Sequence, residues 1–155
     1  MKIYEPGTDE DLLVLKWWGL LTETGDLGRA FVRAIWPLSE FMVNMGGNTI
    51  LTYEADEQGI WFATWYDPIM SGAFCGLWVR EDKRNMEAVK AGHLSMRIAF
   101  ETFPVLITAT RSESVRKTAQ RQGFKDLGVV PHLFDLEDAF VLYATKKSFE
   151  ELNGG

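Results

Sequence analysis

The sequence predicts an α/β protein of the α+β type, with four helices and a mixed, mostly antiparallel sheet of about seven strands. The stretch from Gly72 to Gly128 predicts strand, charged turn, long helix, strand and helix. This order is a βαβ unit, whose two strands run parallel. Hairpin patterns on either side of it, at 49–66 and 127–145, predict antiparallel pairs. The expected order is β-α-α-β-β-β-α-β-α-β-β in a single domain spanning residues 1–155.

The composition is that of a globular protein with a sizeable core. The chain has 155 residues, of which 46% are hydrophobic and 25% charged. Its net charge of -6 argues against a broad nucleic-acid surface. Cys75 is the single cysteine, and no apolar run has the length of a signal peptide or membrane span. We therefore expect a cytoplasmic protein with neither nucleic-acid nor membrane partners, and without a zinc site.

The N-terminal third predicts a short strand and two helices. Residues 2–5 form the strand, and Thr8 with Asp11 three residues later is a typical helix start. A second amphipathic pattern covers 27–42, where Pro37 predicts a kink. The residues expected to be buried on the first helix are Leu12, Leu15 and Trp18, with Trp17 and Leu21 beside them.

The central elements follow from changes of period. Strands are expected at 49–55, 60–66 and 72–80, because residues of high strand propensity alternate with turn residues there. A helix is expected from about Asn85 to Phe103, with Pro104 ending it. The residues expected on its apolar face are Val89, His93, Met96, Phe100 and Phe103.

The last third predicts a strand, a helix and a hairpin. Residues 105–110 are a short apolar run, as expected of a strand buried on both faces. Ser112 is expected to cap a helix that ends at Gln122, with Gly123 as its C-terminal glycine. Strands at 127–134 and 139–145 follow, and the polar tail from Lys146 onward is expected to fray.

The order of elements, together with the segment KTAQRQGFKDLG, resembles the Gcn5-related N-acetyltransferase superfamily over nearly the whole chain. The resemblance implies that acetyl-coenzyme A lies between splayed fourth and fifth strands. Its pantetheine would pair with the backbone of Leu77, Trp78 and Val79, and its pyrophosphate would meet the start of the next helix. The other implied cofactor-binding residues are Lys83, Arg84, Asn85, Lys90 and Ser112.

Four residues depart from the family pattern. Glu87 and Val89 occupy the positions where small residues let phosphate approach the backbone. Ser112 stands where the family often has an asparagine, and Ala119 stands where it often has the tyrosine that protonates the leaving thiolate. These departures resemble phage-encoded members with a degenerate phosphate turn. The alternative to an enzyme is therefore a non-catalytic binding or structural protein, such as a phage internal virion or host-takeover factor, located in the host cytoplasm or the virion.

The catalytic hypothesis is N-acetyl transfer by direct attack of an amine on the thioester. The acceptor would be a small-molecule or protein amine. Because an ammonium must first lose a proton, we predict Glu54 or Asp67 as the base. Tyr143 is the candidate to replace the missing acid. Surface charge for the carboxylates and strand packing for the tyrosine are the competing interpretations.

Overall fold

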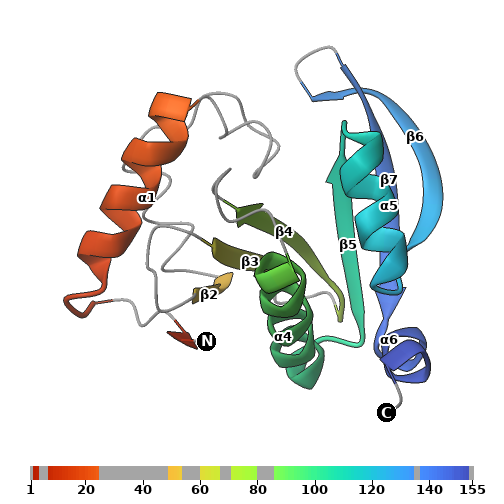
Figure 1. Cartoon of the computed structure of the whole chain (residues 1–155), viewed down its shortest axis with the longest axis horizontal. Helices are drawn as coiled ribbons and strands as arrows, with labels where there is room; N and C mark the ends of the chain where they lie inside the picture. Colours follow the sequence, from red (N-terminus) through yellow and green to blue (C-terminus); the bar gives the residue numbers. More distant parts are fainter. Residues whose placement is uncertain are drawn as a thin grey trace.

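Seven strands form one mixed sheet in the computed structural model (Figure 1). The structure describes residues 2–3, 7–24, 49–53, 60–66, 71–79, 86–134 and 137–153, with side chains for 7–23, 71–76, 89–133 and 137–153. The strands are β1 (Lys2–Ile3), β2 (Thr49–Tyr53), β3 (Ile60–Tyr66), β4 (Ala73–Val79), β5 (Val105–Thr110), β6 (Lys125–Phe134) and β7 (Glu137–Thr145). Their order across the sheet is β1-β2-β3-β4-β5-β7-β6.

A single parallel pair, β4 with β5, interrupts the antiparallel pairing of the described strands. The α+β class and the mixed sheet are therefore confirmed. The described helices are α1 (Asp11–Thr24), α4 (Met86–Thr102), α5 (Glu113–Arg121) and α6 (Lys146–Asn153). The helix expected at 27–42 lies outside the described residues.

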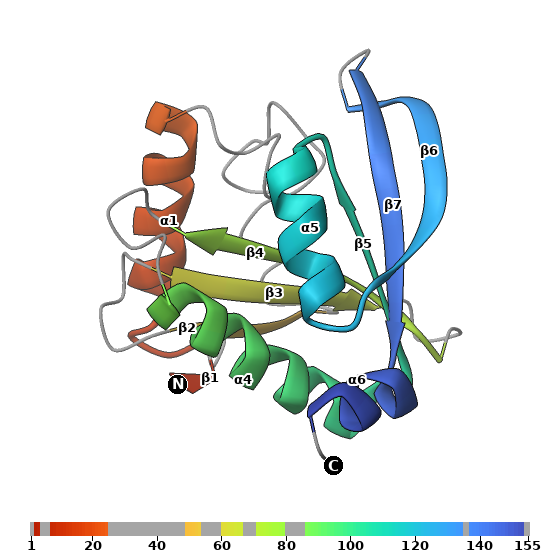
Figure 2. The same cartoon turned by 45° about the vertical axis from the view of Figure 1, so that its right-hand side comes forward.

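Helices α4, α5 and α6 gather over β5 and its neighbours, whereas α1 stands apart from α5 and α6, beside the first strands (Figure 2). The three helices share one core with the sheet. Its buried side chains are Ala73, Cys75, Met96, Ala99, Phe100, Phe103, Leu106, Phe124, Leu142, Ala144 and Phe149. Alternation along the strands then places Phe74, Ile107 and Tyr143 on the opposite face of the sheet.

The buried face of α1 differs from the expected one. Leu12 and Leu15 are exposed, whereas Val14, Trp17 and Leu21 are fully buried. The stretch from 12 to 15 is apolar at every position, so the spacing of apolar residues could not select the face. The helix also begins at Asp11, after a turn in which Asp11 N donates to Thr8 O at 3.0 Å.

The end of α5 explains the Gly-Phe pair in the sequence. Gly123 has φ 103°, its N–H donates to Gln120 O at 3.1 Å, and Phe124 N–H donates to Ala119 O at 3.1 Å. This pair of bonds is a Schellman motif, which requires a residue with positive φ at the glycine position. The motif turns Phe124 into the core, where it is buried.

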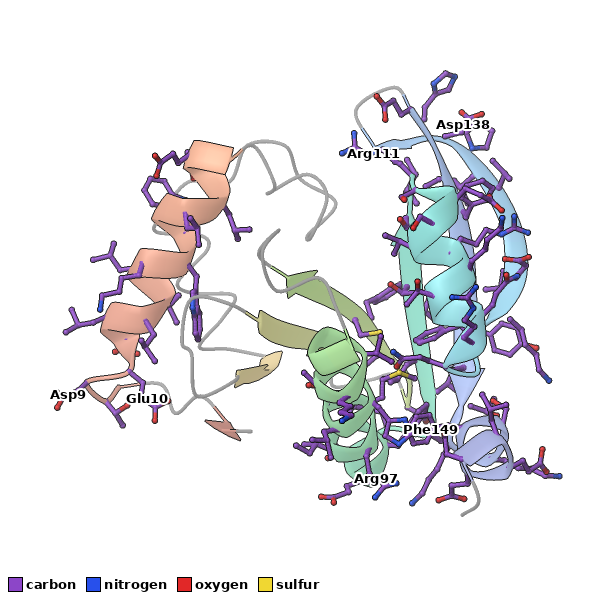
Figure 3. The ribbon with its side chains drawn as sticks, in the orientation of Figure 1. Asp9, Glu10, Arg97, Arg111, Asp138 and Phe149 are labelled. Atoms are coloured by element: carbon purple, nitrogen blue, oxygen red, sulfur yellow. The ribbon has the colours of Figure 1, made fainter. Side chains whose placement is uncertain are left out.

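The expectation of a frayed tail is wrong, because residues 146–153 form α6. Its first turn is capped reciprocally: Ser148 N donates to Thr145 Oγ1 at 3.0 Å, and Thr145 N donates to Ser148 Oγ at 3.1 Å. Phe149 points from α6 toward α4 (Figure 3) and is buried against Phe100, with ring centroids 5.2 Å apart. Phe149 is therefore the buried side chain that anchors α6 to the core.

Candidate functional site

Strand β5 is paired very differently along its two edges. All six of its residues pair with β7, from Val105 with Thr145 to Thr110 with Phe140. Only two pairs join it to β4, Ala73 with Leu106 and Phe74 with Ile107. Both strands continue beyond these pairs and diverge (Figures 1 and 2). The parallel pair is therefore closed at one end and open at the other.

The direction of the backbone groups on β5 follows from one hydrogen bond. Lys146 N donates to Pro104 O at 2.9 Å, across the start of the ladder with β7. Bonded and non-bonded pairs alternate in an antiparallel ladder, so the even-numbered residues of 106–110 direct their backbone groups toward β7. The odd-numbered residues, Ile107 and Ala109 among them, direct theirs toward β4.

The same alternation applies to β4, which pairs with β3 over its whole length. Because Ile107 faces β4, the odd-numbered residues of β4 face β5 and the even-numbered residues face β3. Leu77 and Val79, two of the residues expected to pair with pantetheine, thus direct backbone groups toward β5. They face the gap, which is the opening left where β4 and β5 diverge. Trp78, opposite Trp61, directs its groups toward β3.

At the point where the ladder ends, a side chain replaces the next backbone bond. Continued pairing would place Cys75 opposite Thr108, and the Ala109 N–H would donate to the Cys75 carbonyl. Instead, Thr108 Oγ1 donates to Cys75 O at 3.0 Å. Among the described strands, none pairs with the backbone groups of Leu77, Val79 and Ala109 that face this opening.

The Cys75 thiol lies at this closed end but is a poor nucleophile. Burial raises its pKa to about 12, and the hydrogen bond with the Thr108 side chain opposes that rise. The thiol is therefore protonated at neutral pH, whereas the thiolate is the reactive form. Cys75 acts as a small buried residue of the core.

The start of α5 adjoins the open end of β5. Ser112 is exposed there, and its Oγ accepts from Val115 N at 3.3 Å as the helix cap. Helix α5 is held to β6 by Arg116, whose Nε donates to Asp126 Oδ1 at 3.0 Å. That hydrogen bond also holds the pKa of Asp126 below its usual range. Ser112 thus has a structural role as a cap, and its contact with a cofactor stays a prediction.

Most of the phosphate-binding and catalytic candidates lie outside the described residues. These are Lys83, Arg84, Asn85, Glu54 and Asp67. Lys90 is described and is exposed in the first half of α4. Ala119 packs against the core.

Tyr143 lies on β7, in register with Ile107 on one side and Lys125 on the other. It is half-buried. Its neighbours Leu142 and Ala144 are buried in the shared core, so Tyr143 points to the opposite face. The tyrosine is level with the last pair of the β4–β5 ladder, and its role as an acid stays a prediction.

Thr108 is the site residue that the sequence reasoning missed. The segment was expected to be buried on both faces, but Leu106 is its only fully buried residue. The expectation failed because a strand beside an opening has lost one of its neighbours. The available signal was Thr108 itself, a hydroxyl within an apolar strand.

The described part of the chain offers few other functional features. Within it, no cluster of three histidine, cysteine or acidic side chains is arranged to hold a metal ion. Its helices also include none with the length and apolar character needed to cross a membrane.

Comparison with solved structures identifies the fold as that of the Gcn5-related N-acetyltransferases. One similar structure is RimJ of Mycobacterium smegmatis in complex with CoA-disulfide, with a TM-score of 0.71 and 11% identity over 98% of this chain and 87% of that one. A Gcn5-related N-acetyltransferase from Kribbella flavida gives a TM-score of 0.66 and 14% identity, over 93% of this chain and 96% of that one.

Another similar structure is the Salmonella typhimurium acetyltransferase that modifies the N-terminal serine of ribosomal protein L7/L12. Its TM-score is 0.68 at 12% identity, over 92% of this chain and 93% of that one. No protein-family model matches the sequence, and no curated protein does. At these identities the likeness establishes the fold, and the expectation from the KTAQRQGFKDLG segment is confirmed at that level.

Proposed function

We propose that this protein is an acetyl-coenzyme A-dependent N-acyltransferase that binds the acyl donor between β4 and β5. The observation that carries the proposal is the early end of the β4–β5 ladder after two residue pairs. Backbone N–H and C=O groups are strong hydrogen-bonding groups that need partners. The pantetheine arm of coenzyme A carries amides that can supply them to Leu77, Val79 and Ala109.

The reaction is attack of an amine nitrogen on the acetyl carbonyl of the thioester. A C–N bond forms and the C–S bond breaks, the nitrogen loses a proton, and the thiolate accepts one. We assign the base to Glu54 or Asp67 and propose Tyr143 as the acid. The solved structures of this fold include enzymes named for ribosomal-protein and aminoglycoside acetylation, so both peptide and small-molecule amines belong in the acceptor screen.

The first test is calorimetric titration of the protein with acetyl-coenzyme A. Amines are then incubated with the protein and acetyl-coenzyme A and analysed by mass spectrometry. The panel contains peptides with free N-termini, lysine peptides, aminoglycosides and polyamines. We expect a dissociation constant of about 1 mM or tighter. Absence of heat up to several times that concentration, with no transfer to any amine, would overturn the proposal and favour the non-catalytic alternative.

A steric variant links any binding to the gap. Ala109→Trp places a large ring beside the unpaired edge of β5, and we expect it to weaken acetyl-coenzyme A binding by about tenfold or more. Lys147→Trp is the matched control, because it adds the same ring at an exposed position of α6. Equal binding by both variants would place the ligand elsewhere.

A further inference from the structure

The hydroxyl of Thr108 occupies an acceptor that the backbone of its own strand would otherwise use. The Cys75 carbonyl is the first group on β4 beyond the last ladder pair, and the Ala109 N–H is its expected donor. The hydroxyl reaches that carbonyl at 3.0 Å and takes the place of the N–H. The hydrogen bond from the Thr108 side chain therefore takes the place of the backbone bond that would continue the β4–β5 ladder.

We propose that Thr108 is a positioning residue for acyl transfer, because its hydroxyl ends the β4–β5 ladder at Cys75 and keeps the Ala109 N–H available to the bound acyl donor. This inference rests on the proposed function. It adds the residue that sets how deeply the donor enters between the strands, and hence where the reacting thioester stops.

The energetics explain why a side chain is needed. A buried carbonyl without a donor costs about 1–3 kcal/mol, so an opening that simply abandoned Cys75 O would tend to close. Cys75 is buried in the core, and its carbonyl is satisfied by the Thr108 hydroxyl. Strand residues repeat every 3.3 Å or so, so one extra ladder pair would shift the inner end of the site by about that distance.

The two variants Thr108→Val and Thr108→Ser separate the hydroxyl from the size of the side chain. Valine keeps the branched shape and removes the donor, so the Ala109 N–H can bond to Cys75 O. We expect exchange of the Ala109 amide to slow by about tenfold in the ligand-free valine variant, and to stay unchanged in the serine variant. Simple destabilisation would accelerate this exchange, and such acceleration would overturn the inference.

The kinetic test uses the full chain and any acceptor amine found in the screen. In Thr108→Val we expect kcat to fall by about tenfold or more while KM for acetyl-coenzyme A changes less than about threefold, because the reacting end shifts. Serine should restore kcat. Thr118→Val is the matched control, since its hydroxyl bonds to Ser114 O within α5 and does not reach β4.

The outcomes separate this inference from the proposed function. If the wild-type protein does not bind acetyl-coenzyme A, the proposed function fails, while the exchange experiment still decides whether Thr108 ends the ladder. If the wild type binds and transfers acetyl but Thr108→Val has unchanged kcat and exchange, the role of Thr108 is refuted and the function stands. Thr108→Ala replaces valine in both assays should the valine variant fold poorly.

Discussion

The two edges of β5 belong to one strand of six residues, yet one edge is fully paired and the other is mostly open. Intrinsic strand propensity cannot explain this difference, because it acts on both edges alike. The neighbouring strands explain it. β7 is held to β5 along its length and continues into the anchored helix α6, whereas β4 follows β3 over seven residue pairs and leaves β5 after two.

The sheet is therefore joined at a narrow point between β1–β4 and β5–β7. The joint consists of Ala73 and Phe74 on one side and Leu106 and Ile107 on the other. Leu106 lies at this joint, is 0% exposed and belongs to the core under α4. The open edge of β5 therefore lies directly beside a small, well-packed joint.

Leu106→Ala should have the largest effect on stability, because it removes packing at the joint that both edges of β5 share. We expect the free energy of unfolding to fall by about 3 kcal/mol, the cost of a leucine deletion in a core. Urea denaturation measures this change. Leu127→Ala on β6 is the control, since Leu127 is 59% exposed and its loss should cost about 0.5 kcal/mol or less. Similar losses in both variants would show that the joint is not specially packed.

Gly123→Ala tests the turn after α5, through which the chain returns to form β6 and β7. Pairing with β7 makes the closed edge of β5. Alanine at φ 103° should cost about 1–2 kcal/mol, because its Cβ disfavours positive φ. Its Cβ would lie 3.6 Å from Phe149 Cα, an ordinary contact, so crowding adds little to this cost. Urea denaturation again provides the measurement.

Gly19→Ala is the opposite control for Gly123. Gly19 lies within α1, and no atom of the described residues beyond the helix's own backbone comes within 4 Å of the position that a Cβ would take there. Alanine should therefore stabilise the helix by about 0.5–1 kcal/mol. If the two alanine substitutions change stability in opposite directions, the difference isolates the effect of backbone conformation. A neutral Gly123→Ala would contradict the assigned role of the Schellman motif.

Elements with strong local signals were predicted closely. The strand at 60–66 and the long helix, expected at about 85–103 and observed at Met86–Thr102, are examples. The cap at Ser112 and the glycine at 123 were also correct, because capping chemistry is local. These elements, in their order along the chain, were sufficient to indicate the fold.

Tertiary packing decided what the sequence could not. The uniformly apolar start of α1 left its buried face undetermined, and α6 was missed because its stability depends on Phe149 reaching a core made by distant residues. Likewise, the hydroxyl of Thr108 within an apolar strand could not reveal its partner, since Cys75 lies 33 positions away. The gap was expected from family resemblance, but the side chain that ends the ladder became visible only in the folded structure.

His93 should make the closed edge weakly sensitive to acid. Its ring lies 4.9 Å from that of Phe149, the residue that anchors α6 beyond the end of β7. Burial, with a smaller contribution from the charge on Arg97, lowers the pKa of His93 below the ordinary 6.5. The folded protein therefore binds a proton less readily than the unfolded chain, so this contribution to stability is present above pH 6.5 and is lost as the pH falls below it.

His93→Gln removes this titration. We expect its effect on stability to be smaller than the effects of Leu106→Ala and Gly123→Ala. The difference in Tm between wild type and variant should shift against the wild type as the pH is lowered from 8 to 5, and thermal unfolding followed by circular dichroism measures it. Carboxylates common to both proteins contribute equally and cancel in the difference. A difference that stays constant across this range would show that the contact between α4 and α6 does not respond to protonation.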